Sequence, residues 1–318
     1  MVTDNPSIHA RPPPRVDRIV ECVPNFSEGR RREVVDAIAD AARAVPRVTV
    51  LDVEMDANHN RSVITLVGDP SAVAEAAFRM AAKAAERIDL NVHRGEHPRV
   101  GAMDVCPFIP IRGVTMGDCV RLARELGMRI ASELGIPVYL YEAAATRPDR
   151  KALPDVRKGE YEGLKVEIET NPDRAPDFGP RRLHPTAGAT VVGARPPLIA
   201  YNVNLGTSDV KVVKRIAKLV REKDGGLAAV RALGFELKDR GLVQVSMNLV
   251  DYKVTGIADA FDAVSRHAAN LGVTVAASEI VGLVPEDALP PSPVARLKLE
   301  GFDPSVQVLE SRLRASVG

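Results

Sequence analysis

The segment His93–Arg99, HRGEHPR, gathers two histidines, one glutamate and two arginines in seven consecutive residues. A neutral imidazole titrates near pH ~6.5, so either histidine could take and return a proton at physiological pH. The same letters also fit H-x-x-E-H, a zinc-protease pattern. The segment therefore indicates a metal site, an acid/base centre, or a polar loop whose histidines only form hydrogen bonds.

The zinc interpretation requires a helix, because both imidazoles must lie one turn apart on the same face to reach one metal ion. Gly95 costs roughly 1 kcal/mol in a helix interior, and Pro98 pushes His97 toward extended backbone. We therefore predict a loop and no metal site. A loop histidine pair with a third ligand from DVEMDANHN, residues 52–60, is the weaker alternative.

Two further segments carry side chains suited to binding. The long loop APDFGPRRLHPTAGATVVGARPP, residues 175–197, could let its backbone approach a flat heterocycle while its arginines bind carboxylates, although a solvated surface role fits them as well. In the strand YNVNLG, Asn202 and Asn204 alternate and so face one side, where two amides could line a polar pocket or end at a sheet edge.

Composition excludes several classes of protein. The chain has 318 residues, 45% of them hydrophobic, and 43 basic against 42 acidic side chains, so no whole-chain field favours nucleic acid or membrane. Three cysteines without a CxxC pair predict free thiols and a cytoplasmic location. No apolar run is long enough to span a bilayer, and residues 1–17 are predicted to be a disordered tail, not a targeting signal.

The elements that would position these segments repeat once along the chain. Alternating and helical periodicities predict strand, helix, strand, strand, helix, strand in each half, at residues 18–29, 31–45, 48–56, 61–68, 71–88 and 102–111, and then 197–206, 208–223, 228–239, 241–252, 255–272 and 273–285. Between the halves we expect a helix at 116–135, a strand at 136–142 and a polar surface linker at about 145–180.

This order predicts an α+β protein of two tandem ferredoxin-like (βαββαβ) subdomains with a ligand groove between them. We expect the first subdomain at residues 18–180 and the second at 181–318. The tail after Pro293 is expected to be helical and to pack against one sheet.

Nine segments, in the same order from about Arg18 to Pro285, closely resemble the glutamate formimidoyltransferase (formiminotransferase) family. They are ECVPNFSEGRR, LDVEMDANHNRSV, HRGEHPRVGAMDVCPFIPIRG, PVYLYE, APDFGP, GATVVGAR, YNVNLGT, QVSMNLVD and SEIVGLVP. The third is long and specific enough that chance agreement is improbable.

The resemblance implies transfer of a formimino group from N-formimino-L-glutamate to nitrogen-5 of tetrahydrofolate, a co-substrate held between two subdomains, with no metal. It implies that His97 is the catalytic base. Glu54 stands where the family has an acidic partner for that histidine, with Asp56 two residues on, and Glu54 is our choice. The implied folate-binding loop comprises Gly179, Pro180, Arg181, Arg182, Leu183, His184, Pro185, Thr186, Ala187 and Gly188.

Other contacts are proposed from charge and position: Arg61, Arg99 and Arg112 for glutamate or folate carboxylates, and Asn202 and Asn204 for the pterin. The family further suggests a homodimer and a single-function enzyme whose product passes to a separate cyclodeaminase. Two alternatives stay open, namely formyl transfer between glutamate and 5-formyltetrahydrofolate, and a folate-binding protein without turnover.

Overall fold

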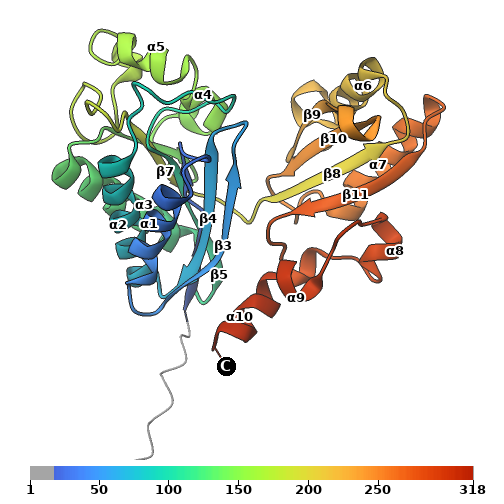
Figure 1. Ribbon diagram of the computed structural model, residues 1–318, viewed down its shortest axis with the longest axis horizontal. Helices are drawn as coiled ribbons and strands as arrows, with labels where there is room; N and C mark the ends of the chain where they lie inside the picture. Colours follow the sequence, from blue (N-terminus) through green and yellow to red (C-terminus); the bar gives the residue numbers. More distant parts are fainter. Residues whose placement is uncertain (1–17, 318) are drawn as a thin grey trace, which may run out of the picture.

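The computed structural model describes residues 18–317, so the predicted tail at 1–17 lies outside the described residues. The strands and helices expected at the positions given above are present, within a few residues at each end, except that the first expected strand is divided into two short strands, Ile19–Cys22 and Asn25–Phe26. The chain forms a mixed α+β structure with two separate sheets (Figure 1). Within residues 18–317, no helix is long and apolar enough to cross a membrane.

The first sheet has antiparallel strands in the order β5-β1-β4-β3, with β2 continuing β1 between the same neighbours. Their bounds are β1 Ile19–Cys22, β2 Asn25–Phe26, β3 Val48–Asp56, β4 Arg61–Gly68 and β5 Met103–Arg112. One face packs against α1 Arg32–Arg43, α2 Pro70–Arg87 and α3 Met116–Leu134 through apolar residues of both layers. Figure 1 shows these three helices on the side of the sheet away from the second half.

The helix starts follow from local chemistry. Asp69 caps α2 by accepting hydrogen bonds from the backbone N–H groups of Ser71 and Ala72. Thr115 and Asp118 form a reciprocal capping box at the start of α3. Alanine-rich faces then let α1 and α2 lie close together over the sheet.

The second sheet repeats this topology, with order β11-β8-β10-β9 and all neighbours antiparallel. Its strands are β8 Ile199–Leu205, β9 Val230–Leu237, β10 Leu242–Leu249 and β11 Val275–Val281. The helices α6 Val210–Val220 and α7 Ile257–Asn270 cover one face and enclose a second apolar core. In each half, therefore, the last strand lies beside the first and the third lies between the first and second.

A strand that we did not expect lies at the junction of the halves. β7, Thr190–Ala194, runs parallel to β5 and to β6, Val138–Glu142, and so belongs to the first sheet. The expected division at residue 180 is therefore too early, because hydrogen bonds tie residues 190–194 to the first half. We propose that the boundary lies between Ala194 and Ile199.

The expected surface linker at 145–180 is also corrected. It contains α4 Leu153–Val156 and α5 Glu160–Glu167, whose Tyr161 and Leu164 are buried. These helices pack on the second face of the first sheet, near β6 and β7, where they form a separate apolar cluster. The segment is thus a structural layer rather than a free connector.

The C-terminal segment joins the two halves. Its helices are α8 Pro293–Leu297, α9 Pro304–Gln307 and α10 Leu309–Val317. Leu297 and Val308 belong to the core of the second half, whereas Leu309 packs with Ile19 and Leu51 of the first. The predicted helical tail is confirmed, but it contacts both halves instead of one sheet.

Candidate functional site

The HRGEHPR segment is a loop, as Gly95 and Pro98 predicted, so the helix required by a zinc-protease motif is absent from it. The turn between β3 and β4 fixes it from one side. Asn60 donates from Nδ2 to the carbonyl of Arg94 (2.9 Å), and a Cβ added at Gly95 would lie 2.2 Å from the carbonyl oxygen of His59. Only glycine permits that close approach.

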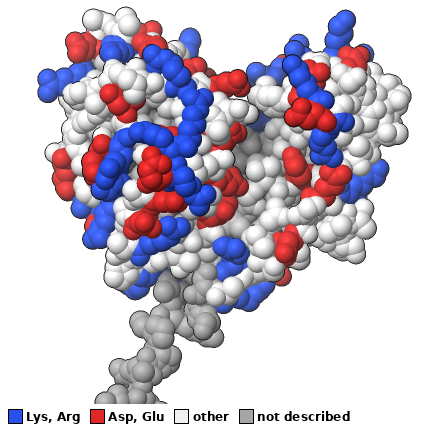
Figure 2. Space-filling model, viewed as in Figure 1, with Lys and Arg blue, Asp and Glu red and all other residues white. Residues whose placement is uncertain are grey.

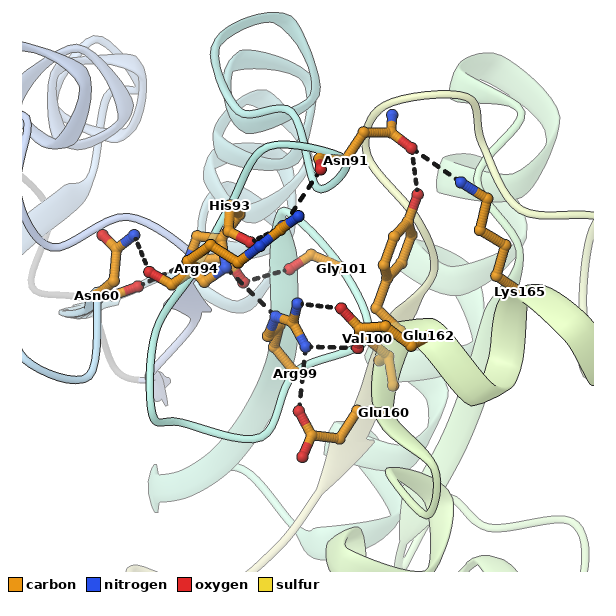
Figure 3. Close-up of polar contacts among 12 residues, drawn as sticks. Asn60, Asn91, His93, Arg94, Arg99, Val100, Gly101, Glu160, Glu162 and Lys165 are labelled. Carbon is orange, nitrogen blue, oxygen red and sulfur yellow. Dashed lines mark hydrogen bonds and ion pairs between the residues drawn. The ribbon is translucent and has the colours of Figure 1, made fainter.

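The predicted folate-binding loop fixes the other side. The N–H of Leu90 donates to the carbonyl of Thr186 (2.8 Å), and Asn91 donates from Nδ2 to the carbonyl of Pro185 (2.8 Å). Asn91 Oδ1 in turn accepts from the hydroxyl of Tyr161 and the ammonium of Lys165, both at 3.0 Å (Figure 3). Two loops far apart in sequence are thus brought together and held by α5.

His93 is a buried structural residue. Its Nε2 lies 3.0 Å from the carbonyl oxygen of Asn60, and its Nδ1 accepts from Arg99 Nε at 3.3 Å. Because the Arg99 side chain only donates, the His93 ring is neutral with its proton on Nε2. Burial lowers the pKa of His93. Both ring nitrogens are engaged by the protein, so His93 supports the loop.

Arg99 was expected to bind a ligand carboxylate, and the geometry corrects this. Its guanidinium donates to Glu162 at 2.6 and 2.8 Å and to Glu160 at 3.0 Å, both on α5 (Figure 3). These bonds satisfy the buried cation and raise its pKa despite burial. Arg99 therefore connects His93 to α5.

His97 has a different environment. Its Nε2 lies 2.9 Å from Arg61 Nη1, and since a guanidinium only donates, Nε2 accepts and Nδ1 carries the ring proton. Burial, followed by the cations of Arg61 and Arg157, lowers the pKa of His97 from 6.5 to about 3. The imidazole is therefore neutral at physiological pH, with its lone pair directed at an arginine.

This neutral histidine predicts a pH dependence of folding stability. Between pH 3 and 6.5 the unfolded chain binds a proton at His97 that the folded chain does not, so the free energy of unfolding rises with pH across that window. His97→Gln should reduce the slope of the free energy of unfolding against pH by up to the equivalent of about one bound proton. Urea unfolding at pH 4.5, 5.5 and 6.5 measures it; equal slopes for variant and wild type would contradict the low pKa.

The two carboxylates considered as partners of His97 do not hydrogen-bond to it. Asp56 accepts from His59 Nδ1 at 2.6 Å and from two backbone N–H groups of its own turn. Glu54 is half-buried, and burial followed by the charge of Asp52 raises its pKa, while Arg61 opposes that shift. The charges of Glu54 and Arg61 thus influence each other without an ion pair between them.

A buried ion pair that the sequence did not reveal lies beside His97. Arg157, from the turn after α4, donates from Nη2 to Asp104 Oδ2, and Asp104 Oδ1 accepts from the N–H of Val100 at 2.7 Å. Asp104 also lines one hollow with the loop residues, together with Phe26, Ser27, His59, Asn60, Arg61, His93, His97 and Arg99. Sequence reasoning did not identify Arg157 as a site residue, because it is a single cation in a polar, charged segment.

The loop at 179–188 is built around a tight turn. His184 and Gly188 exchange backbone hydrogen bonds at 3.0 and 3.2 Å, and His184 Nδ1 accepts from the N–H groups of Thr186 and Ala187. Burial lowers the pKa of His184. Pro180 and Leu183 are half-buried, whereas Gly179, Arg181, Arg182 and Pro185 are exposed. The loop presents two arginines to solvent while its histidine stabilises the turn.

The second sheet presents an amide-rich face. Asn202 and Asn204 lie on the side opposite α6 and α7, as alternation predicted. Asn202 donates to Glu279 at 2.9 Å, and Gln244 donates to both Glu279 and Asn204. Sequence reasoning missed Glu279 and Gln244, because only strand register places them beside the asparagines.

The halves meet across an open notch whose walls carry acidic side chains (Figure 2). Arg231 of β9 forms an ion pair with Glu142 of β6 at 3.2 Å. A Cβ added at Gly282, just after β11, would lie 3.5 Å from Glu54 Oε1. The Glu54 carboxylate therefore lies against the second half.

Comparison with known proteins assigns the family. The family model of the formiminotransferase domain, N-terminal subdomain, matches residues 19–195, and that of the formiminotransferase domain matches residues 200–293. The chain belongs to the formiminotransferase family. The two matched regions coincide with the two sheets, and the first contains the whole HRGEHPR loop with Arg61 and Arg157.

Formiminotransferase relatives match over nearly the whole chain. The glutamate formimidoyltransferase of Thermoplasma acidophilum is 53% identical over 297 residues, covering 93% of this chain and 97% of the relative. The glutamate formimidoyltransferase of Streptococcus pyogenes serotype M1 is 47% identical, and the match covers 93% of this chain and 99% of the relative. The formimidoyltransferase-cyclodeaminase of Sus scrofa is 48% identical over 86% of this chain, which spans about half of the relative, 51%.

Proposed function

We propose that this protein transfers the formimino group of N-formimino-L-glutamate to nitrogen-5 of tetrahydrofolate, giving 5-formiminotetrahydrofolate and glutamate. The observation that carries the proposal is the full-length similarity to glutamate formimidoyltransferases, which includes the loop that holds a neutral His97 beside Arg61. Tetrahydrofolate is a co-substrate in this reaction. The reaction belongs to histidine degradation and one-carbon metabolism.

We assign acid/base catalysis to His97. Nitrogen-5 attacks the formimino carbon and gives its proton to Nε2, the ring nitrogen without hydrogen. A tetrahedral intermediate forms. The imidazolium then protonates the glutamate nitrogen, the carbon–nitrogen bond to glutamate breaks, and the carbon–nitrogen double bond re-forms on the folate. Proton transfer by a positioned group contributes about 10²–10⁴-fold in rate. We keep Glu54 as the proposed acidic partner, acting on Arg61 through its charge and not through a hydrogen bond.

Each half is proposed to be a ferredoxin-like subdomain, with folate held in the notch between them. The equal strand orders β5-β1-β4-β3 and β11-β8-β10-β9, each with its two crossover helices on one face, support this description. Residues 179–188 from the first half, with Asn202 and Asn204 from the second, are the proposed folate contacts. Exposed Arg181 and Arg182 suit the glutamate tail of folate.

The proposal is tested by mixing the protein with tetrahydrofolate and either formiminoglutamate or formylglutamate, then acidifying to convert product to methenyltetrahydrofolate, which absorbs in the near ultraviolet. Absorbance is expected with the imine donor. Absorbance only with the formyl donor would replace the proposed reaction by formyl transfer. Saturable folate binding without product from either donor would refute both enzymatic functions.

The cellular setting is proposed by the same reasoning. The pig relative joins its transferase region to a second one named as a cyclodeaminase, so we propose that a cyclodeaminase consumes the product here. Cys22, Cys106 and Cys119 are free thiols, which supports a reducing compartment such as the cytoplasm. A homodimer remains a prediction.

A further inference from the structure

Arg61 is a half-buried cation that lacks an anionic partner. Within residues 18–317 it forms no ion pair, and its Nε is buried without a hydrogen-bond partner. Two other arginines with little exposed side chain are paired, Arg150 with Asp177 and Arg157 with Asp104. An unpaired buried charge is costly. Arg61 is therefore suited to an anion that arrives with a ligand.

Among residues 18–317, the shortest hydrogen bond of Arg61 occupies the lone pair of His97 Nε2. Its Nη1 donates to His97 Nε2 at 2.9 Å, with a longer contact of 3.4 Å to Asn25 Oδ1. A guanidinium binds a carboxylate best through two parallel N–H donors. A carboxylate that took the Nη1 and Nη2 edge would compete directly with His97. Binding an anion and freeing the imidazole are thus coupled by geometry.

We propose that Arg61 is the anchor for a carboxylate of the formimino donor, and that the donor frees His97 Nε2 by drawing Arg61 away. This inference rests on the proposed function. The α-carboxylate of formiminoglutamate is attached to the carbon that bears the leaving nitrogen. Anchoring it on a guanidinium adjacent to His97 brings the bond that breaks within reach of the imidazole that returns the proton. In the free enzyme, the hydrogen bond from Arg61 therefore occupies the lone pair of His97 Nε2 until the donor binds.

Arg157 completes the electrostatics of this carboxylate subsite. Its charge is the second cause, after burial, that lowers the pKa of Arg61, so the two guanidinium groups repel each other. The Nε of Arg157 is also buried without a partner. Asp104 neutralises only one of the two cations by direct contact. The pair therefore favours a donor that carries carboxylates over an uncharged amidine such as formamidine.

The first test observes His97 directly by NMR of histidine-labelled full-length protein titrated with glutamate, the released product. Without ligand, His97 should be neutral with its proton on Nδ1. Saturating glutamate should shift the Nε2 resonance and raise the pKa of His97, because the bond from Arg61 is lost. Saturable glutamate binding that leaves the Nε2 resonance and the pKa of His97 unchanged would overturn the proposal. Failure to bind glutamate at all would also overturn it.

The second test compares variants by kinetics. Arg61→Met should raise the KM for formiminoglutamate by roughly 10- to 100-fold, as expected for losing hydrogen bonds to a charged group, while the dissociation constant for tetrahydrofolate stays the same. Arg61→Lys, which keeps the charge but not the paired donors, should give a smaller increase. Arg32→Met, at an exposed arginine of α1, is the control and should match wild type.

These outcomes separate the two proposals. If wild-type protein transfers no formimino group, the proposed function fails, whereas the NMR titration still decides whether glutamate displaces Arg61. If wild-type protein is active and folded Arg61→Met keeps the wild-type KM for the donor, the carboxylate anchor is wrong and the proposed function stands. Circular dichroism checks that each variant is folded. If Arg61→Met is unfolded, the KM of Arg61→Lys for the donor is used in its place.

Discussion

His97→Gln should lower kcat for formimino transfer by roughly 10²–10⁴-fold, because the variant keeps a polar side chain of similar length but cannot carry the proton. The dissociation constant for tetrahydrofolate should change little, since His97 is assigned to the chemical step. Single-turnover kinetics with saturating donor and folate measure this loss without interference from product release.

A second histidine provides the control for that variant. His267 lies on α7, on the helix-covered side of the second sheet, so His267→Gln should retain wild-type kcat. If His97→Gln keeps more than about a tenth of wild-type kcat, the loss is smaller than general acid/base catalysis provides. The proton would then travel by another group, and the assignment of His97 would be wrong.

Gly188→Ala should destabilise the protein by about 2–4 kcal/mol, because it combines backbone strain with a steric clash. Gly188 has φ of +70°, and an added Cβ would lie 2.4 Å from the carbonyl oxygen of Val100. The Cβ would push the turn at 184–188 away from the HRGEHPR loop. We therefore expect a lower free energy of unfolding in urea and also weaker tetrahydrofolate binding.

Gly163→Ala is the matched control for that substitution. Gly163 lies within α5, and an added Cβ would meet no atom within 4 Å. Alanine should stabilise the helix by roughly 0.5–1 kcal/mol relative to glycine. Equal effects of the two substitutions would show that the contact between the loops does not constrain Gly188.

The order of elements could be predicted because it depends on local periodicity. Strands such as Val48–Asp56 and helices such as Pro70–Arg87 carry that pattern in their own residues. β7 was missed because its residues continue a loop rich in glycine and proline, to which we had assigned them. Tyr161 and Leu164 lie among charged residues such as Glu160, Glu162 and Lys165, so a buried layer resembled a surface linker.

The site was predictable only in part, for a similar reason. The loop conformation at His97 followed from its own Gly95 and Pro98, and the adjacent asparagines of β8 from strand alternation. The pairing of Arg99 with Glu162, and of Arg157 with Asp104, joins residues more than fifty positions apart. Such pairings depend on tertiary packing, so the sequence could show that these arginines were charged but not which partners they had.

The fate of a labelled formimino carbon tests the central claim most directly. Protein, tetrahydrofolate and formiminoglutamate carrying ¹³C in the formimino group are combined and followed by NMR. We predict that the label moves to nitrogen-5 of the folate at the rate at which unlabelled glutamate appears, and that Arg32→Met does the same. Label that stays on glutamate, or that appears as formamide in solution, would contradict formimino transfer by this protein.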